Sequence, residues 1–226
     1  MEKKYSIAID GPAGAGKSTI AKALAGVLDY HYVDTGAIYR TVAYFLDLLG
    51  ISPKDADGVS RYLDELTVGI TYDADGKQHM LMNGMDVTDE IRTPDISQKA
   101  SLVSAYPIVR EMLLDMQRDM ARNYNVIMDG RDIGTVVLPD ATVKIFLTAS
   151  PEERARRRTK ELQEKGQKAD YEKILKDIQQ RDYQDSHRAV APLKQASDAV
   201  LLDSSELEIP EVIAKLKEII GEKIPL

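Results

Sequence analysis

Eight residues near the N-terminus, Gly11 to Ser18, read GPAGAGKS and match the pattern GxxxxGK followed by Ser or Thr at every fixed position. The apolar run Tyr5 to Asp10 comes directly before them and predicts a buried strand. The apolar residues that follow fall at helical spacing: Ile20, Leu24, Val27 and Leu28. Between a strand and a helix, such glycines let backbone N–H groups wrap a phosphate, and the helix adds its positive N-terminal end. The segment therefore predicts a P-loop rather than a turn without a ligand.

A P-loop predicts that the chain binds ATP. The Lys17 ammonium would reach the β- and γ-phosphates, and the Ser18 hydroxyl would ligate Mg²⁺, the cofactor that we expect with ATP. The predicted ATP-binding residues run through the loop: Gly11, Pro12, Ala13, Gly14, Ala15, Gly16, Lys17, Ser18 and Thr19.

Strand and helix patterns alternate along the rest of the chain. Further strands are predicted at 31–33, 126–128, 143–147 and 199–202. Helices are predicted at 36–49, from Pro107, from Pro151, from Tyr171 and around 212–220. This order predicts an α/β fold of the P-loop NTPase type, with three layers and a five-stranded parallel sheet covered on both faces. Ligands bind beyond the C-terminal ends of such strands, so chemistry is expected at 11–17 and 129–132.

The region from Thr67 to Val87 has a different pattern, in which apolar residues alternate and turns intervene. Asn83-Gly84 between two such runs is a strong hairpin signal. We expect a small antiparallel sheet of two or three strands in this region. It would form an insertion over residues 63–104 within a single domain that spans residues 1–226.

The composition excludes several functions. With 30 Lys and Arg against 37 Asp and Glu, the net charge of −7 argues against binding to duplex nucleic acid. The absence of Cys excludes disulfides and thiol catalysis, and three widely separated His residues argue against a histidine metal cluster. The first apolar stretch is too short for a signal peptide, and no run approaches the length of a membrane span. We expect a cytoplasmic monomer with no nucleic-acid or membrane partner.

The P-loop leaves the reaction open. A guanine-reading Asn/Thr-Lys-x-Asp stretch and the LSGGQ sequence of transporter ATPases are both absent, which favours a kinase with a second pocket for an acceptor. The segment DTGAIYR, from Asp34 to Arg40, marks that pocket. Two alternatives stay open here: a kinase for another acceptor, such as UMP or a small metabolite, and a nucleotide-binding switch that transfers no phosphoryl group.

Four motifs occur in the order and spacing typical of bacterial cytidylate kinases: GPAGAGKS, DTGAIYR, DGRDIGT at 129–135 and HRAVAPL at 187–193. The chain resembles that family from about Ile7 to past Leu202. The resemblance implies that ATP phosphorylates CMP and dCMP, with Mg²⁺, in pyrimidine nucleotide metabolism. The length of the insertion argues against the eukaryotic-type UMP/CMP kinases and adenylate kinases, which are shorter there.

The resemblance also implies how the acceptor is bound. Arg40, Arg131 and Arg188 would bind its phosphate, because guanidinium groups make paired hydrogen bonds to phosphate oxygens. Ser101, Arg110 and Asp132 would read cytosine, whose amine donates to a carboxylate while N3 and O2 accept from an arginine. Arg181 and Asp185 would contact the ribose. Thr35 stands in the acceptor motif where Ser is also found, and both keep a hydroxyl.

Without the resemblance, these residues have simpler interpretations. Each Arg could form a surface ion pair, as Arg181 and Asp185 could at their i, i+4 spacing. Asp132 could cap a turn, and Ser101 could lie at the start of a helix.

Four arginines crowd the start of one predicted helix in an acidic chain: Arg154, Arg156, Arg157 and Arg158. Such a segment, here 151–186, is typical of a mobile lid whose arginines meet the charge on the transferring phosphoryl group. The alternative is a solvated helix face balanced by glutamates. The pattern does not say which arginine acts. Asp129 resembles the acidic residue that orders magnesium-bound water, and the predicted catalytic set is Lys17, Asp129, Arg131 and Arg158.

Overall fold

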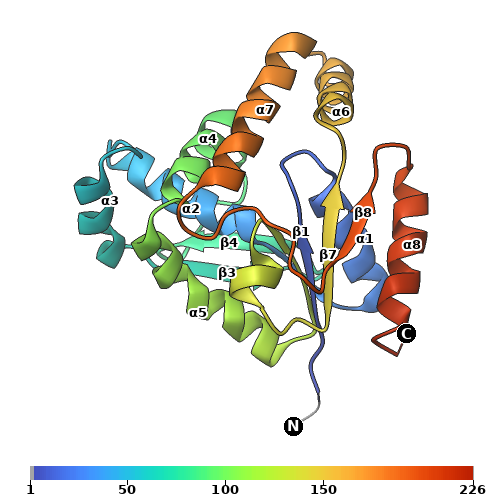
Figure 1. The fold of residues 1–226 in the computed structure, drawn as a ribbon. Coiled ribbons are helices and arrows are strands. Elements are labelled where there is room, and N and C mark those ends of the chain that lie inside the picture. Colours follow the sequence, from blue (N-terminus) through green and yellow to red (C-terminus); the bar gives the residue numbers. More distant parts are fainter. Residues whose placement is uncertain (1–2, 226) are drawn as a thin grey trace.

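The computed structural model describes residues 3–225. Its main sheet has five strands, β1 (Ser6–Asp10), β2 (His31–Asp34), β6 (Val126–Gly130), β7 (Val143–Thr148) and β8 (Val200–Asp203). They lie in the order β2-β6-β1-β7-β8, and every pair is parallel (Figure 1). The predicted five-stranded parallel sheet is therefore confirmed.

Helices cover both faces of this sheet and form a core on each. Successive side chains of β1 alternate between these two cores. Ile7 and Ile9 pack with apolar residues of α1 (Lys17–Leu28) and α8 (Ile209–Gly221). Ala8 belongs to the opposite core, with α2 (Thr35–Leu48), α4 (Pro94–Val103) and α5 (Pro107–Asn123). The three layers expected from the alternating pattern are thus present.

The second sheet is antiparallel and has three strands, β3 (Val68–Tyr72), β4 (Gln78–Met82) and β5 (Met85–Asp86), which confirms the expected small sheet. Asn83 and Gly84 turn the chain between β4 and β5 with φ of 50° and 83°, the left-handed values that an Asn-Gly hairpin needs. Short helices flank the sheet: α3 (Ala56–Tyr62), η1 (Leu63–Glu65) and η2 (Glu90–Arg92).

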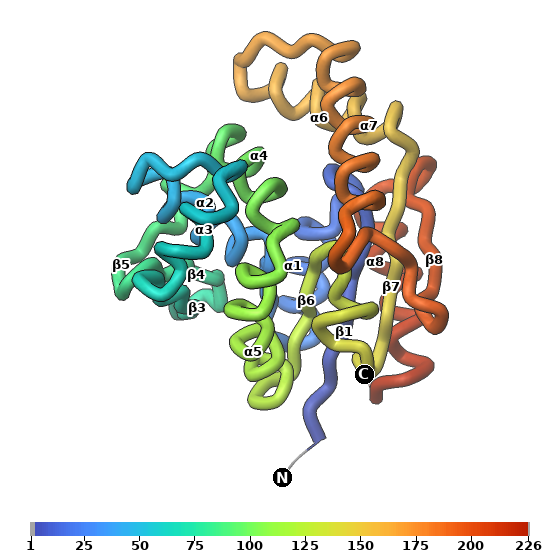
Figure 2. Tube along the Cα trace, turned by 60° about the vertical axis from the view of Figure 1, so that its left-hand side comes forward, coloured from blue at the N-terminus to red at the C-terminus, as the bar shows by residue number. Residues whose placement is uncertain are grey.

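Helices α6 (Pro151–Glu164) and α7 (Tyr171–His187) form a hairpin that projects from the C-terminal end of the sheet (Figures 1 and 2). Pro151 begins α6 after Ser150, whose hydroxyl accepts a hydrogen bond from the N–H of Glu153. Asp170 caps α7 in the same way, accepting from Lys173. Both helices begin at the residue that the sequence predicts. Within residues 3–225, no helix combines the length and the apolar character that crossing a membrane requires.

Candidate active site

The P-loop lies between β1 and α1, as predicted. Gly11 has φ of 151°, and a Cβ there would lie 1.9 Å from the carbonyl oxygen of Leu147, so this position admits only glycine. Lys17 folds back over the loop and donates from Nζ to the carbonyl of Pro12 at 2.7 Å. Burial, and then the charge of Arg131, holds the pKa of Lys17 below its ordinary value. The buried Lys17 ammonium and the N-terminus of α1 thus present hydrogen-bond donors at one place, which suits a phosphate.

Asp129 is the last residue but one of β6 and lies beside the P-loop, because β6 pairs with both β1 and β2. Its Oδ2 accepts from the Ser18 hydroxyl at 2.9 Å, and its Oδ1 accepts from the Tyr32 hydroxyl at 2.8 Å. Burial, and then the charge of Asp34, raises the pKa of Asp129. A hydroxyl next to a carboxylate at the phosphate end of the loop offers the hard oxygen donors that Mg²⁺ prefers, so these residues fit that ion.

A cavity of about 830 Å³ opens beyond the ends of the strands, between the P-loop, α4 and the α6–α7 hairpin. Every predicted site residue except Gly11 and Pro12 lines it. Gly11 packs against the backbone of β7, and the Pro12 carbonyl accepts from Lys17. The structure therefore brings the predicted donor and acceptor residues to one space.

The middle of this cavity is rich in guanidinium groups. Arg40 pairs with Asp34 at 2.9 Å, and Arg131 donates from Nε to Asp185 at 2.9 Å. The Nε atoms of Arg40 and Arg181 are buried and have no hydrogen-bond partner. Burial, and then the charge of Arg131, lowers the pKa of Arg181. Three guanidinium groups face two carboxylates here, and two of the three have an unpaired donor. This part of the cavity is therefore suited to an anion.

The far end of the cavity holds a second charged group centred on Asp132. One of its oxygens accepts from Arg110, and the other accepts from Arg188 at 3.2 Å. The three side chains are 6–8% exposed. Arg110 also donates to the carbonyl of Ser104 at 3.1 Å. Arg188 lies one residue past the end of α7 and donates from Nη2 to Asp132, one of the predicted base-reading residues, and from Nε to the carbonyl of Ala191.

The arginines of α6 lie in different surroundings. Arg154 is 2% exposed, donates to the carbonyl of Ala13 at 2.9 Å and pairs with Asp182 of α7. Arg156 and Arg157 pair with Glu153, and Arg158 pairs with Glu161. The like charges are therefore balanced by neighbouring carboxylates. Arg154 ties the α6–α7 hairpin to the P-loop, a contact that helical spacing does not reveal.

Comparison with known proteins decides the family. A model of the family described as cytidylate kinase matches residues 7–222. The chain belongs to the cytidylate kinase family. Its relatives include the cytidylate kinase of Carboxydothermus hydrogenoformans, 50% identical over 96% of this chain and 97% of that protein. The cytidylate kinase of Lactobacillus johnsonii is 49% identical over 99% of both chains.

A solved structure of an uncharacterized protein from Eubacterium ventriosum has a TM-score of 0.53 and 13% identity, covering 97% of this chain and 99% of that one. At that identity the likeness shows the fold alone. The shared fold agrees with the three-layer arrangement described above for this member of the cytidylate kinase family.

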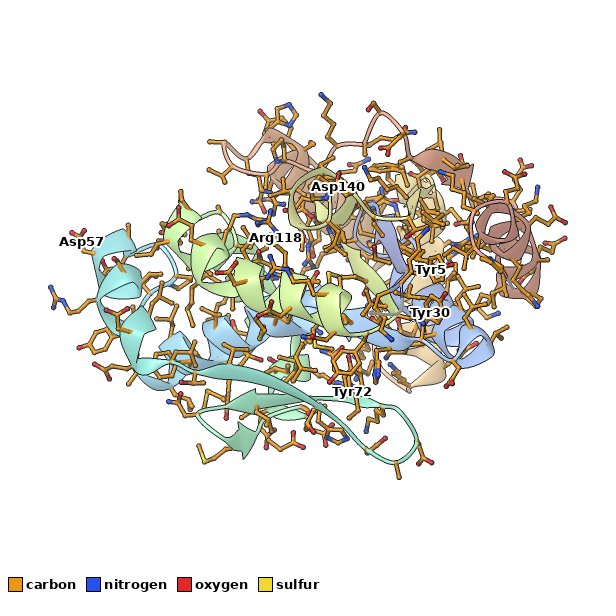
Figure 3. The ribbon with its side chains drawn as sticks, turned by 90° about the horizontal axis from the view of Figure 1, so that it is seen from below. Tyr5, Tyr30, Asp57, Tyr72, Arg118 and Asp140 are labelled. Atoms are coloured by element: carbon orange, nitrogen blue, oxygen red, sulfur yellow. The ribbon has the colours of Figure 1, made fainter. Side chains whose placement is uncertain are left out.

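Two residues that the sequence did not single out hold the turn after Arg131 and Asp132 in this cytidylate kinase family member. Asp10 is 4% exposed and accepts from the N–H groups of Ile133 and Gly134, each at 2.7 Å. Burial raises the pKa of Asp10 to about 6, although those two hydrogen bonds oppose the shift. Arg118 of α5, labelled in Figure 3, donates to the carbonyls of Val136 and Val137 at the other end of the turn η3 (Ile133–Val137).

A signal for Asp10 was present in the sequence, since a charged residue closes an otherwise apolar strand directly before the P-loop. Arg118 gave no such signal, because it reads as an exposed residue of an amphipathic helix.

Proposed function

We propose that this chain transfers the γ-phosphoryl group of ATP to CMP or dCMP, giving ADP and CDP or dCDP. The observation that carries the proposal is the single cavity in which a P-loop, an arginine-rich anion site and the Arg110–Asp132 pair follow one another. That order matches the parts of an ATP-to-nucleotide transfer: donor phosphates, acceptor phosphate and acceptor base.

The donor phosphates bind at the P-loop in this proposal. Backbone N–H groups of residues 13–19 surround them, and Lys17 moves its ammonium from the Pro12 carbonyl to a phosphate oxygen. The Ser18 hydroxyl would ligate Mg²⁺, and Asp129, which accepts from Ser18, would accept hydrogen bonds from water on that ion. When bound, the metal neutralises charge on the β- and γ-phosphates.

The acceptor phosphate binds between Arg40, Arg131 and Arg181. Its oxygens would accept hydrogen bonds from the buried Nε atoms of Arg40 and Arg181, and its charge would offset that of the three guanidinium groups. Arg188 reaches the same phosphate if it leaves Asp132 when the nucleotide enters. Asp185 remains beside Arg131 and is placed to accept from a ribose hydroxyl. Arg181 thus serves the phosphate in addition to its predicted contact with the ribose.

Cytosine binds at the far end of the cavity. Asp132 accepts from the exocyclic amine, Arg110 donates to N3 or O2, and Ser101 lies on the same wall. Uracil carries a carbonyl where cytosine carries the amine, so it would face the Asp132 carboxylate without a hydrogen to share. This contact supplies the preference for CMP.

Transfer itself needs no covalent intermediate on the protein, because the acceptor phosphate is already anionic. Lys17 and Arg131 hold the two substrates in line and offset the charge of their phosphates. Residues 151–186 act as a lid that brings Arg158 to the transferring group, and the buried contact of Arg154 with Ala13 fixes the base of that lid. Residues 63–104 act as the nucleotide-monophosphate-binding insertion, through Ser101 of α4.

The base of ATP would occupy the remaining wall of the cavity, formed by residues 204–209 and Arg157. Arg157 donates to the carbonyl of Ser204, so its guanidinium plane is held where an adenine ring could stack on it. One chain thus supplies both substrate sites, which is why we propose a monomer. We also propose that the protein acts on these nucleotides in the cytoplasm.

A panel of acceptors tests the proposal. ADP release from ATP is measured with CMP, dCMP, UMP and a set of small metabolites, each in the presence of Mg²⁺. We expect CMP and dCMP to give the highest kcat/KM. A higher value with UMP or a metabolite would identify a different kinase, and ATP turnover that no acceptor stimulates would identify a nucleotide-binding switch.

A further inference from the structure

The Tyr32 phenol is buried beside Asp129 and has no part in the reaction described above. Tyr32 lies in the middle of β2 and is 5% exposed. Its hydroxyl donates to Oδ1 of Asp129 at 2.8 Å, across 97 residues of sequence. Burial, and then the charge of Asp129, raises the pKa of Tyr32, so this hydroxyl keeps its proton and acts as a donor.

Asp129 is held at three points. Its Oδ2 accepts from Ser18, its backbone carbonyl accepts from the Thr35 hydroxyl at 2.7 Å, and its Oδ1 accepts from Tyr32. The contact with Ser18 lies on the side of the carboxylate that faces the P-loop. Without Tyr32, Oδ1 would be a buried carboxylate oxygen that lacks this hydrogen bond, which is costly, and the carboxylate would be free to turn toward another donor.

The ring of Tyr32 is itself fixed in place. It packs in the core with α1 and α8, and the Lys22 ammonium lies 5.4 Å from its centroid. The Tyr32 backbone carbonyl accepts from the hydroxyl of Tyr72, a residue of β3 that Figure 3 labels, at 2.8 Å. A ring packed in the core on an anchored strand delivers its hydroxyl to one position, which is what orienting a carboxylate requires.

We propose that Tyr32 is a positioning residue, which turns the Asp129 carboxylate so that Oδ2 faces Ser18 and the water on the metal of bound ATP. The proposal rests on the function proposed above for Asp129. Residues that orient the groups around a metal change metal affinity or activity by about 10- to 100-fold when they are replaced. Tyr32→Phe keeps the ring and removes only the hydroxyl, so it isolates this contact.

The chain offers a matched control. Tyr72→Phe also removes one phenolic hydrogen bond to this part of β2, but that bond reaches the Tyr32 carbonyl and not Asp129. Both variants keep an aromatic ring in place. A loss confined to Tyr32→Phe therefore reports on Asp129, whereas an equal loss in both variants reports on the packing of β2.

The test is calorimetric binding of ADP to the full chain, with Mg²⁺ and with EDTA, in the parent, Tyr32→Phe, Tyr72→Phe and Asp129→Asn. We expect Tyr32→Phe to weaken binding in Mg²⁺ by about 10- to 100-fold and to leave binding in EDTA unchanged. Tyr72→Phe should match the parent under both conditions. Thermal unfolding of each variant verifies that the chain is folded.

The outcomes separate the inference from the function on which it rests. If Asp129→Asn weakens Mg²⁺-dependent binding and Tyr32→Phe does not, the role of Tyr32 is wrong and that of Asp129 stands. If neither variant weakens it, both roles are wrong. Should Tyr32→Phe fail to fold, site-specific replacement by 3-fluorotyrosine keeps the ring and hydroxyl but changes the donor strength. An unchanged Mg²⁺ dependence in that protein would overturn the proposal.

Discussion

Replacing Asp132 by Asn changes the charge at the base end of the cavity with the smallest change in shape. In the parent, the Asp132 carboxylate accepts from Arg110 and Arg188, and all three side chains are nearly buried. An Asn at this position keeps one oxygen that can accept from the cytosine amine. It also gains an NH₂ group that can donate to the O4 carbonyl of uracil, so it accommodates both bases.

The expected loss of selectivity follows from that exchange. A good contact to the edge of a base discriminates by about 1–3 kcal/mol, so the ratio of kcat/KM for CMP to that for UMP should fall roughly 5- to 150-fold. Removing one partner of a buried ion pair costs roughly 3–5 kcal/mol of stability. Asn retains an acceptor, so we expect a lower melting temperature but a folded enzyme.

The assay measures kcat/KM for CMP and UMP in the parent, Asp132→Asn and Arg40→Ala, with circular dichroism as the test of folding. Arg40 lies at the anion site and pairs with Asp34 rather than with Asp132, so its removal should weaken both acceptors alike and leave the ratio nearly unchanged. An Asp132→Asn enzyme that prefers CMP as strongly as its parent would show that this carboxylate only holds Arg110 and Arg188 in place.

Three further predictions concern other parts of the chain. Lys17→Ala should abolish most of kcat in a folded protein, because its ammonium neutralises charge on the transferring phosphoryl group, and near-parental turnover would contradict the assignment of the P-loop. Residues 151–186 should gain protection from hydrogen exchange when ATP and CMP are added together, and equal protection with and without them would remove the lid from the mechanism. Hydrogen bonds to Asp86 and Asp73 raise the pKa of His79, so these contacts should stabilise the β3–β4 hairpin below pH 6.5 and weaken as the pH rises through the raised pKa. The protection factors of hairpin amides, which correct for the intrinsic pH dependence of exchange, should be higher at pH 6 than at pH 8 in the parent and equal at both in His79→Gln.

The parts of the site that the sequence predicts well are local. The P-loop needs only a strand, eight residues and a helix, and Asp129 to Asp132 follow a strand whose apolar pattern is unambiguous. Their convergence follows from a general property of parallel sheets, in which the C-terminal ends of the strands share one edge.

Contacts across the sheet could not be predicted in the same way. The bond between Tyr32 and Asp129 depends on the pairing of β2 with β6, in which Asp34 lies opposite Asp129. In the sequence, Tyr32 is one apolar residue of a short strand, and nothing marks its hydroxyl. Arg154 was equally hidden, because a cluster of arginines on one helix reads as exposed, whereas the first turn of α6 packs onto the P-loop.

The manner in which the small sheet meets β2 has a consequence for solubility. β2 is an edge strand of the main sheet, and such an edge offers backbone groups that can pair with another molecule. Here side chains of the small sheet occupy two of these backbone groups: the Gln78 amide oxygen accepts from the Asp34 N–H at 2.7 Å, and the Tyr72 hydroxyl donates to the Tyr32 carbonyl. The hairpin thus covers the edge without extending the sheet. A shortened chain that lacks the hairpin would expose this edge and be prone to self-association through β2.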